Sequence, residues 1–271
     1  MGIVRNFLSY YGKSNTLQKI QEPFIQKLLL EVLEDDRFYY AFGLLKSLRK
    51  RLEINTTIID ITDLGAGSRV HKSNQRSVKD ILKTSVSPSW QCELLFRLVN
   101  FLQPKTKLEL GTSLGLSTLY QHMPNTSATL YTLEGCPNLA QFATNGFKTY
   151  KAKNIHSIVG DFKETLPDTL KKIGQLDYAF LDGNHQKQPT IDYFEQCLPY
   201  CHNNTVLVFD DIHWSDGMQE AWEQIKKHPQ VSSTLDLFYM GIVFFRQDFE
   251  QKEHYTIINS KYKPWKKLLN H

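Results

Sequence analysis

The sequence lacks any long run of apolar residues. No stretch approaches the roughly 20 apolar residues that a membrane-spanning helix needs, although 41% of the 271 residues are hydrophobic. The start, MGIVRNFLSYYGKS, has neither a long apolar core nor a small-residue cleavage site, so we expect no signal peptide. The four cysteines are too few and too irregularly spaced for a disulfide framework, which favours a reducing compartment. These absences predict a cytoplasmic protein without a membrane span.

The sequence also lacks repeats, low-complexity tracts and a dominant charge. The net charge of +4 is spread along the chain, with local basic excess at 46–51, 69–79 and the C-terminal segment. Such runs are typical of solvated faces, and they are not interleaved with aromatic residues as nucleic-acid grooves are. We therefore expect no nucleic-acid partner.

The order of the patterns predicts an α/β fold. Residues 16–52 and 77–102 have helical periodicity, and the second stretch is broken at SPSW. Beyond Lys105, short apolar runs alternate with amphipathic segments, which is typical of a mostly parallel sheet covered by helices on both faces. Seven runs are expected to be strands, at 107–110, 128–134, 155–160, 177–182, 205–211, 234–240 and 242–246. The last two are separated only by Gly241, too little for a crossover helix, so we expect an antiparallel pair at the sheet edge. Two parts follow: an N-terminal helical extension with a glycine-rich loop (1–84), and a ligand-binding domain (85–271).

Two glycine-containing stretches compete as the nucleotide-binding turn. The stretch KLELGTSLGLSTLY (107–120) has a strand before the glycines, a helical stripe after them, and a next strand that ends in Glu134. Those are the parts of a nucleotide-binding βαβ unit. The stretch DITDLGAGSRVH (60–71) has glycines without these surroundings. We interpret it as a connection or, alternatively, as part of a lid whose Arg69 faces the acceptor and favours an anionic one.

Acidic residues end four consecutive predicted strands. They are Glu134, Asp161, Asp182 and the pair Asp210 and Asp211. Ligands of open α/β sheets bind outside the carboxyl ends of the strands, so this edge is the expected site.

With these motifs, residues 85–246 resemble a class I S-adenosylmethionine-dependent methyltransferase, in particular the O-methyltransferases related to catechol and caffeoyl-CoA O-methyltransferase. LELGTSLGLST, TLEGCP and VGDF are similar to the family's first three motifs. The resemblance implies a Rossmann-like, doubly wound sheet of seven strands with an antiparallel last pair, and methyl transfer to a hydroxyl of a small molecule. It implies that Glu109 and the backbone at Gly111, Ser113 and Gly115 hold the methionine portion with Ser117 nearby, that Glu134 binds both ribose hydroxyls, and that Asp161 and Phe162 lie against the adenine. Gly135 and Asp182 are further candidates for cofactor binding.

The resemblance also suggests the catalytic groups. FLDGNH and VFDDIHW fall where metal-dependent members place their ligands, so Asp182, Asp210 and Asp211 are candidates for binding Mg2+ or Ca2+. The chain departs from the catechol enzyme, because Asp211 replaces an asparagine and His185 replaces a lysine proposed as base. With Asp182 beside it, His185 is the candidate general base. His213 and Trp214 are candidates for stacking on the acceptor.

Several alternatives stay open. A nicotinamide-dependent oxidoreductase would share the glycine turn and the ribose acid, but does not need acids on the later strands. A nucleic-acid methyltransferase usually has a PPY-like strand end, which this sequence lacks. A non-catalytic binder of S-adenosylmethionine would not need the base. For the assembly, a homodimer is one alternative.

Overall fold

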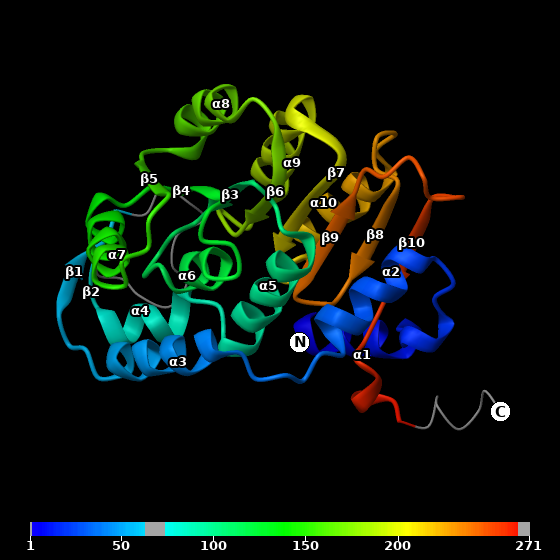
Figure 1. Ribbon diagram of the computed structural model, residues 1–271, viewed down its shortest axis with the longest axis horizontal. Helices are drawn as coiled ribbons and strands as arrows, with labels where there is room; N and C mark the ends of the chain where they lie inside the picture. The colour runs from blue at the N-terminus through cyan, green and yellow to red at the C-terminus, as the bar shows by residue number, and fades with distance from the viewer. Residues whose placement is uncertain (1, 63–73, 265–271) are drawn as a thin grey trace. The chain divides into compact units, whose positions relative to one another are not determined.

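The computed structural model describes residues 2–62 and 74–264 (Figure 1). The chain divides into two compact units. One, here called the terminal unit, combines residues 1–35 with 175–271; the other, the central unit, is residues 36–174. The predicted division at residue 84 assigned residues 1–84 the role of covering the substrate, and that role stays a prediction.

The central unit is built around three parallel strands, in the order β3, β4, β5. Figure 1 shows α8 on one side of these strands and α6 and α7 on the other. A small antiparallel hairpin, β1–β2, lies outside this sheet. The strands are β1 (Ile58–Asp60), β2 (Gln75–Ser77), β3 (Thr106–Leu110), β4 (Thr129–Glu134) and β5 (Ile155–Val159). The helices are α3 (Tyr40–Glu53), α4 (Val78–Ser85), α5 (Ser89–Leu102), α6 (Leu116–His122), α7 (Pro137–Thr149) and α8 (Phe162–Ile173).

The terminal unit has five strands in the order β10, β8, β9, β7, β6. Strand β9 runs antiparallel to both of its neighbours, while β6 and β7, and β8 and β10, pair in parallel. The strands are β6 (Leu176–Leu181), β7 (Cys201–Asp210), β8 (Ser233–Asp236), β9 (Met240–Phe244) and β10 (Glu253–Thr256). The helices are α1 (Gly2–Lys13), α2 (Pro23–Leu28), α9 (Lys187–Cys197) and α10 (Asp216–Lys227), with short helical turns η1 (Leu17–Lys19), η2 (Leu29–Leu33), η3 (Leu198–Tyr200) and η4 (Ser260–Tyr262).

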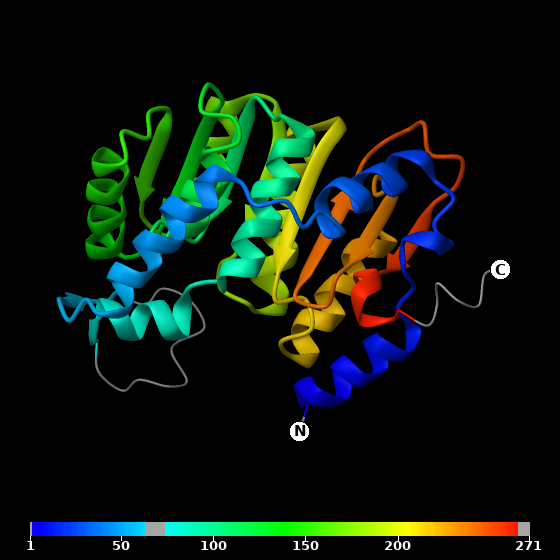
Figure 2. The ribbon, with the colours of Figure 1, turned by 60° about the horizontal axis from the view of Figure 1, so that its bottom comes forward.

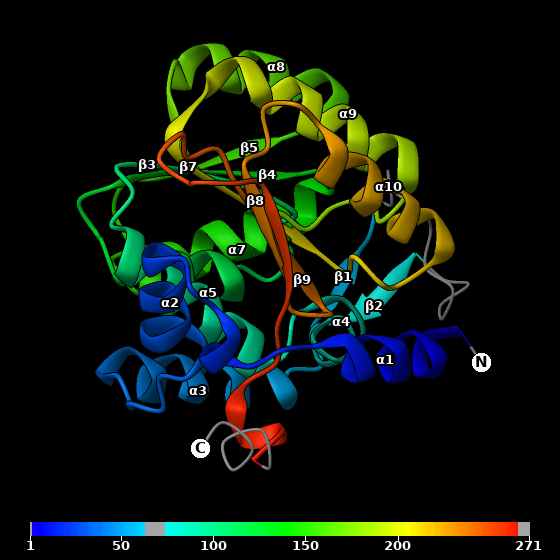
Figure 3. The same cartoon turned by 90° about the vertical axis from the view of Figure 1, so that its right-hand side faces the viewer.

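Helices cover both faces of the terminal unit's strands. Figure 3 shows α9 and α10 on one face and α2 on the other. On the first face, Trp222 of α10 packs so closely on β9 that a Cβ added to Gly241 would lie 2.6 Å from its ring. On the second, the rings of Phe24 and Phe244 meet edge to face at 5.8 Å. Near the chain ends, α1 and the C-terminal segment lie side by side (Figure 2).

The predicted fold class is confirmed. Apart from the β1–β2 hairpin, eight strands are present in the described ranges, β10-β8-β9-β7-β6 in the terminal unit and β3-β4-β5 in the central unit, with most pairs parallel, and all seven predicted strands are among them. Two expectations were wrong. The antiparallel pair is not at the edge, because β10 adds an eighth strand beside β8. The helix expected over 16–52 is interrupted at 34–39, where Tyr39 is extended. Within the described ranges, no helix is long and apolar enough to cross a membrane.

A buried lysine joins β3 to the end of α6. Lys107 has no exposed surface, and its Nζ donates to the backbone oxygens of Gln121 (2.9 Å) and Asn125 (3.1 Å). Gln121 lies in the last turn of α6 and Asn125 just beyond it, at the end of the helix where carbonyls lack helical partners and a cation is favoured. Burial lowers the pKa of Lys107 to about 8. The hydrogen bonds of Lys107 thus stabilise the end of α6, while the burial of its charge at neutral pH destabilises the folded state.

This lowered pKa predicts a pH-dependent stability difference between the wild type and Lys107→Met. Between pH 8 and about 10.4, the unfolded chain keeps the proton that the folded chain has lost, so wild-type stability rises with pH relative to the variant. Urea unfolding at pH 7 and pH 9.5 should show the difference shifting by about 1 to 2 kcal/mol in favour of the wild type. An equal difference at both pH values would contradict this role.

Candidate active site

The loop of residues 111–115 joins β3 to α6 with a sharply turned backbone. Its φ angle is positive at Gly111 (95°), Ser113 (47°) and Gly115 (76°), a region that glycine adopts more readily than other residues. A Cβ at Gly115 would also lie 2.7 Å from the Phe147 ring and 3.1 Å from Ala143 on α7. The glycines therefore permit both the turn and the close packing of α6 on α7.

Below this loop, Glu109 has no exposed surface. Its carboxylate accepts hydrogen bonds from the hydroxyls of Ser117 (2.7 Å), Thr118 (2.5 Å) and Thr132 (2.7 Å) and from the Gln121 amide (2.7 Å). A buried carboxylate requires such donors to replace water. Through these hydrogen bonds Glu109 joins α6 and β4 to β3, and Ser117 is one of its donors. A direct contact of either residue with a cofactor stays a prediction.

The acid at the end of β4 is held by the backbone on two sides. Glu134 accepts the N–H of Ser113 on one carboxylate oxygen (2.8 Å) and the N–H of Cys136 on the other (2.9 Å). It is 9% exposed, and each oxygen has a further lone pair. Gly135, which is half-buried, lies between Glu134 and Cys136 in the sequence. This fixed, two-oxygen acceptor has the chemistry that a pair of ribose hydroxyls requires. The Cys136 amide was missed, because a backbone donor leaves no mark in the sequence.

Asp161 begins the helix that follows β5. Its Oδ1 accepts the N–H of Lys163 (2.9 Å), so it caps α8, and both Asp161 and Phe162 are half-buried. The cap fixes the carboxylate at the carboxyl end of the strand. Contact of these two residues with adenine is untested.

In the terminal unit, His185 pairs with Asp182 at the end of β6. Its Nε2 lies 3.3 Å from Asp182 Oδ1, and its backbone has a positive φ of 38°. Burial lowers the pKa of His185, but the hydrogen bond and charge of Asp182, with the charge of Asp211, outweigh this and raise it. The structure therefore brings together the two residues predicted to be catalytic.

Asp210 and Asp211 end β7 in a strongly negative environment. Burial, followed by the charges of Asp182 and Asp211, raises the pKa of Asp210 well above its usual value. Burial also raises the pKa of Asp211 to about 6, an effect that nearby His185 partly offsets. The Oδ1 of Asp210 is buried without a hydrogen-bond partner. The three predicted metal ligands therefore influence one another electrostatically.

The predicted acceptor residues His213 and Trp214 differ in their surroundings. His213 is fixed, because its Nε2 lies 2.8 Å from Asp236 Oδ2 and its ring stacks on Phe238 at 5.1 Å. Trp214 is 50% exposed. The partners Asp236 and Phe238 were missed as site residues: they fall within a run predicted as strand, and only tertiary structure places them beside His213.

The third predicted acceptor residue, Arg69, lies outside the described residues, as do Gly65 and Gly67. The flanks of that stretch are described and form the β1–β2 hairpin. Asn138 Nδ2 donates to the backbone oxygen of Asp60 (2.8 Å), and the N–H of Thr62 donates to Cys136 Sγ (3.3 Å). The hairpin is thus attached two and four residues beyond Glu134, at Cys136 and Asn138.

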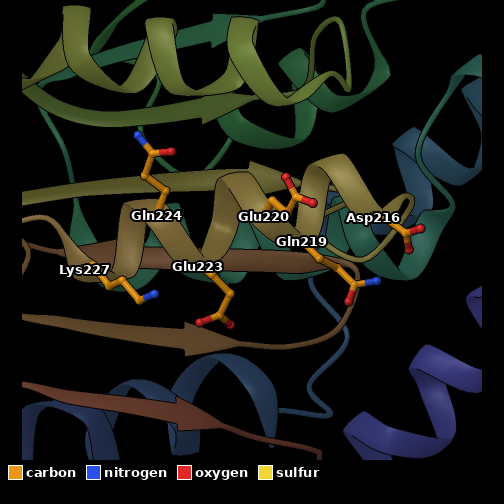
Figure 4. A pocket seen from close by; sticks show the side chains of 6 residues that line it. All are labelled: Asp216, Gln219, Glu220, Glu223, Gln224 and Lys227. Atoms are coloured by element: carbon orange, nitrogen blue, oxygen red, sulfur yellow. The ribbon is translucent and has the colours of Figure 1, made fainter.

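A surface hollow of about 570 Å³ runs along α10 (Figure 4). It is lined by Asp216, Gln219, Glu220, Glu223, Gln224 and Lys227. One of these, Glu220, forms an ion pair with Lys187 at 2.6 Å. None of the predicted cofactor or catalytic residues lines this hollow, so we do not assign the site to it.

Comparisons with known proteins agree with this geometry. Residues 108–212, which include the glycine loop and all four strand-end acids, match a family model described as a methyltransferase domain. An O-methyltransferase of Aspergillus hancockii is 25% identical over 194 residues, which is 65% of this chain and 75% of that protein. A catechol O-methyltransferase of Niastella koreensis is 30% identical over 132 residues, covering 47% of this chain and 58% of that protein.

Solved structures show the same fold. A methyltransferase of Podospora anserina bound to S-adenosylhomocysteine has a TM-score of 0.57 at 16% identity, over 84% of this chain and 97% of the other. An O-methyltransferase of Bacillus cereus, also with S-adenosylhomocysteine, has a TM-score of 0.52 at 18% identity, over 82% and 97%. The predicted resemblance is confirmed: residues 108–212 match a methyltransferase domain, and the chain is similar in sequence to named O-methyltransferases.

The glycine loop gives a direct test. Gly115→Ala should destabilise the protein by roughly 1–3 kcal/mol, because the new Cβ meets Phe147 and the positive φ is strained. The matched control is Gly146→Ala on α7, where nothing lies within 4 Å and a helical alanine should stabilise by up to about 1 kcal/mol. Chemical denaturation measures both changes. Similar values for the two variants would show that Gly115 has no special packing role.

Proposed function

We propose that this chain transfers the methyl group of S-adenosylmethionine to a hydroxyl of a small-molecule acceptor. The observation that carries the proposal is Glu134, whose two carboxylate oxygens are fixed by the amides of the glycine loop and of Cys136. Such an acid, after a strand–glycine loop–helix unit, is the arrangement that binds a nucleoside ribose. The cofactor contacts are those predicted above, with Glu109 and Ser117 also shaping the loop from below.

The chemistry proceeds by in-line displacement. The acceptor oxygen attacks the sulfonium methyl, the carbon–sulfur bond breaks towards sulfur, and the acceptor proton must leave. Its products are a methyl ether, S-adenosylhomocysteine and a proton. His185 is the group we assign to take the proton: with Nε2–H donated to Asp182, its lone pair is on Nδ1. Asp182 orients the imidazole and stabilises its protonated form.

A divalent metal is a separate question. An ion would relieve the repulsion among Asp182, Asp210 and Asp211, and the unpartnered Asp210 Oδ1 is a suitable oxygen donor. However, within 2–62 and 74–264 no group of three or more His, Cys, Asp or Glu side chains is arranged to bind an ion. The donor set therefore does not fit a preformed site. None of the steps above requires Mg2+ or Ca2+, and the binding of either ion stays a prediction; calorimetry with magnesium tests it.

In our proposal, the N-terminal extension helps to form the binding site of the acceptor. Helix α1 contacts the loop that follows Asp211, since Asn6 Nδ2 donates to the backbone oxygen of His213 (3.3 Å). This supports the predicted role of the extension as a substrate cover, beside the aromatic groups of His213 and Trp214. An anionic acceptor, bound by Arg69, remains part of the proposal that awaits a test.

Calorimetric titration distinguishes the cofactors. We expect micromolar binding of S-adenosylmethionine and none of NAD, measured with and without magnesium. In Glu134→Gln one backbone N–H loses its acceptor, so affinity should fall at least tenfold, about 1.4 kcal/mol. The exposed Glu53→Gln on α3 is the matched control and should bind as the wild type does. Binding of NAD without S-adenosylmethionine would instead support the oxidoreductase.

Two of the histidine–aspartate pairs of the terminal unit test the base. His185→Ala should lower kcat at least 100-fold, since loss of a general base costs that much. The control is His202→Ala, because His202 forms a similar pair with Asp177 at 2.9 Å, near the amino end of β7; its kcat should stay within threefold. Methyl transfer from labelled S-adenosylmethionine to a panel of hydroxylated aromatic acceptors is the assay. Equal losses in both variants would remove His185 as the base.

A further inference from the structure

A buried ammonium group holds the end of the N-terminal helix. Lys263 is 3% exposed, and its Nζ donates to the backbone oxygens of Tyr11 and Ser14, the latter at 2.9 Å. It also lies over the Tyr11 ring, 4.5 Å from the centroid. Helix α1 ends at Lys13, so these are carbonyls that lack helical partners, at the end where the helix dipole favours a cation.

The rest of the C-terminal segment binds the same end of α1. Asn15 pairs with Ile257: its N–H donates to Thr256 O (2.8 Å), and its own oxygen accepts from the N–H of Ile258 (2.9 Å). The Tyr10 hydroxyl donates to the Ile257 oxygen. Figure 2 shows the red C-terminal segment beside the end of α1. A helix of 12 residues is marginal by itself, so these contacts determine where α1 lies.

The other side of α1 contacts the loop that carries Asp211. Phe7 and Tyr10 pack on Phe238 at ring distances of 5.1 and 5.2 Å. Phe238 in turn stacks on His213, whose backbone oxygen accepts from Asn6. A chain of contacts therefore runs from Lys263 through α1 to His213.

We propose that Lys263 is a positioning residue for acceptor binding: its ammonium group fixes α1, and α1 fixes residues 211–214. The proposal rests on the function proposed above. Without the ammonium group, the Tyr11 and Ser14 carbonyls lose the Lys263 donor, which the Ser14 hydroxyl's bond to the Tyr11 oxygen (3.0 Å) does not replace, and the last turn of α1 frays. That turn carries Tyr10, so the packing against Phe238 and His213 loosens as well. The glycine loop and Glu134 belong to the central unit, and cofactor affinity should not change.

Hydrogen exchange of the full chain, followed by mass spectrometry, tests this without an acceptor. In Lys263→Met, exchange should rise at least tenfold in peptides covering 2–14 and 211–214, where the amides of Asp211 and Trp214 are hydrogen-bonded. Peptides covering 111–117 should stay within twofold. The matched control is Lys261→Met, two residues away and exposed, which should exchange as the wild type does. Rapid exchange of 2–14 with unchanged 211–214 would overturn the proposal.

A milder variant keeps the test decisive if Lys263→Met does not fold. Asn6→Ala removes only the bond to His213, so exchange of 211–214 should rise about fivefold while 2–14 stays protected; no change would overturn the link from α1 to the loop.

With any acceptor found in the panel, Lys263→Met should raise KM at least fivefold and leave the Kd of S-adenosylmethionine within twofold. An unchanged KM overturns the assignment, whereas failure of the wild type to bind S-adenosylmethionine overturns the proposed function instead.

Discussion

The arrangement of the central unit depends on how one buried carboxylate is satisfied. Glu109 has no access to water, and its oxygens are reached by donors from α6 and from β4. The cost of an unpaired buried charge forces these elements together. The chain between β3 and α6 turns through positive φ angles, and the Ser113 amide lies 2.8 Å from Glu134. The elements that surround one buried acid thus also carry a donor to the second acid, at the end of β4.

The sequence predicted the strands between residues 106 and 244 because each is a short, nearly continuous apolar run between amphipathic helices. It failed where that contrast disappears. Strand β10, EHYT, is largely polar and lies at the sheet edge, so it has no apolar signature. The break at 34–39 contains neither glycine nor proline, so periodicity carried the predicted helix across it. The β1–β2 hairpin has only three residues in each strand, too few to show alternation.

The positions of the strand-end acids were predictable from the strand pattern: Glu134, Asp161, Asp182 and Asp210 end or follow β4, β5, β6 and β7. Their roles in a site stay predictions. The partners of His213 could not be predicted, because Asn6, Asp236 and Phe238 come from three distant segments and meet only through tertiary packing. Nor could the number of donors on Glu109 be predicted: spacing suggests Ser117 and Gln121 on one helical face, but the register of β4 supplies Thr132.

The pairing of the end of α1 with residues 256–263 has a consequence for the order of folding. The central unit, residues 36–174, is continuous in sequence, so its internal contacts close loops no longer than that stretch. Helix α1 has its partners at 213, 238 and 257–263, which lie 207 to 252 residues away along the chain. Until those partners are in place, its apolar side chains, including Phe7 and Tyr10, lack these native contacts. The step that completes the loop beside Asp211 is therefore the closure of very long-range contacts, which are the slowest kind to form.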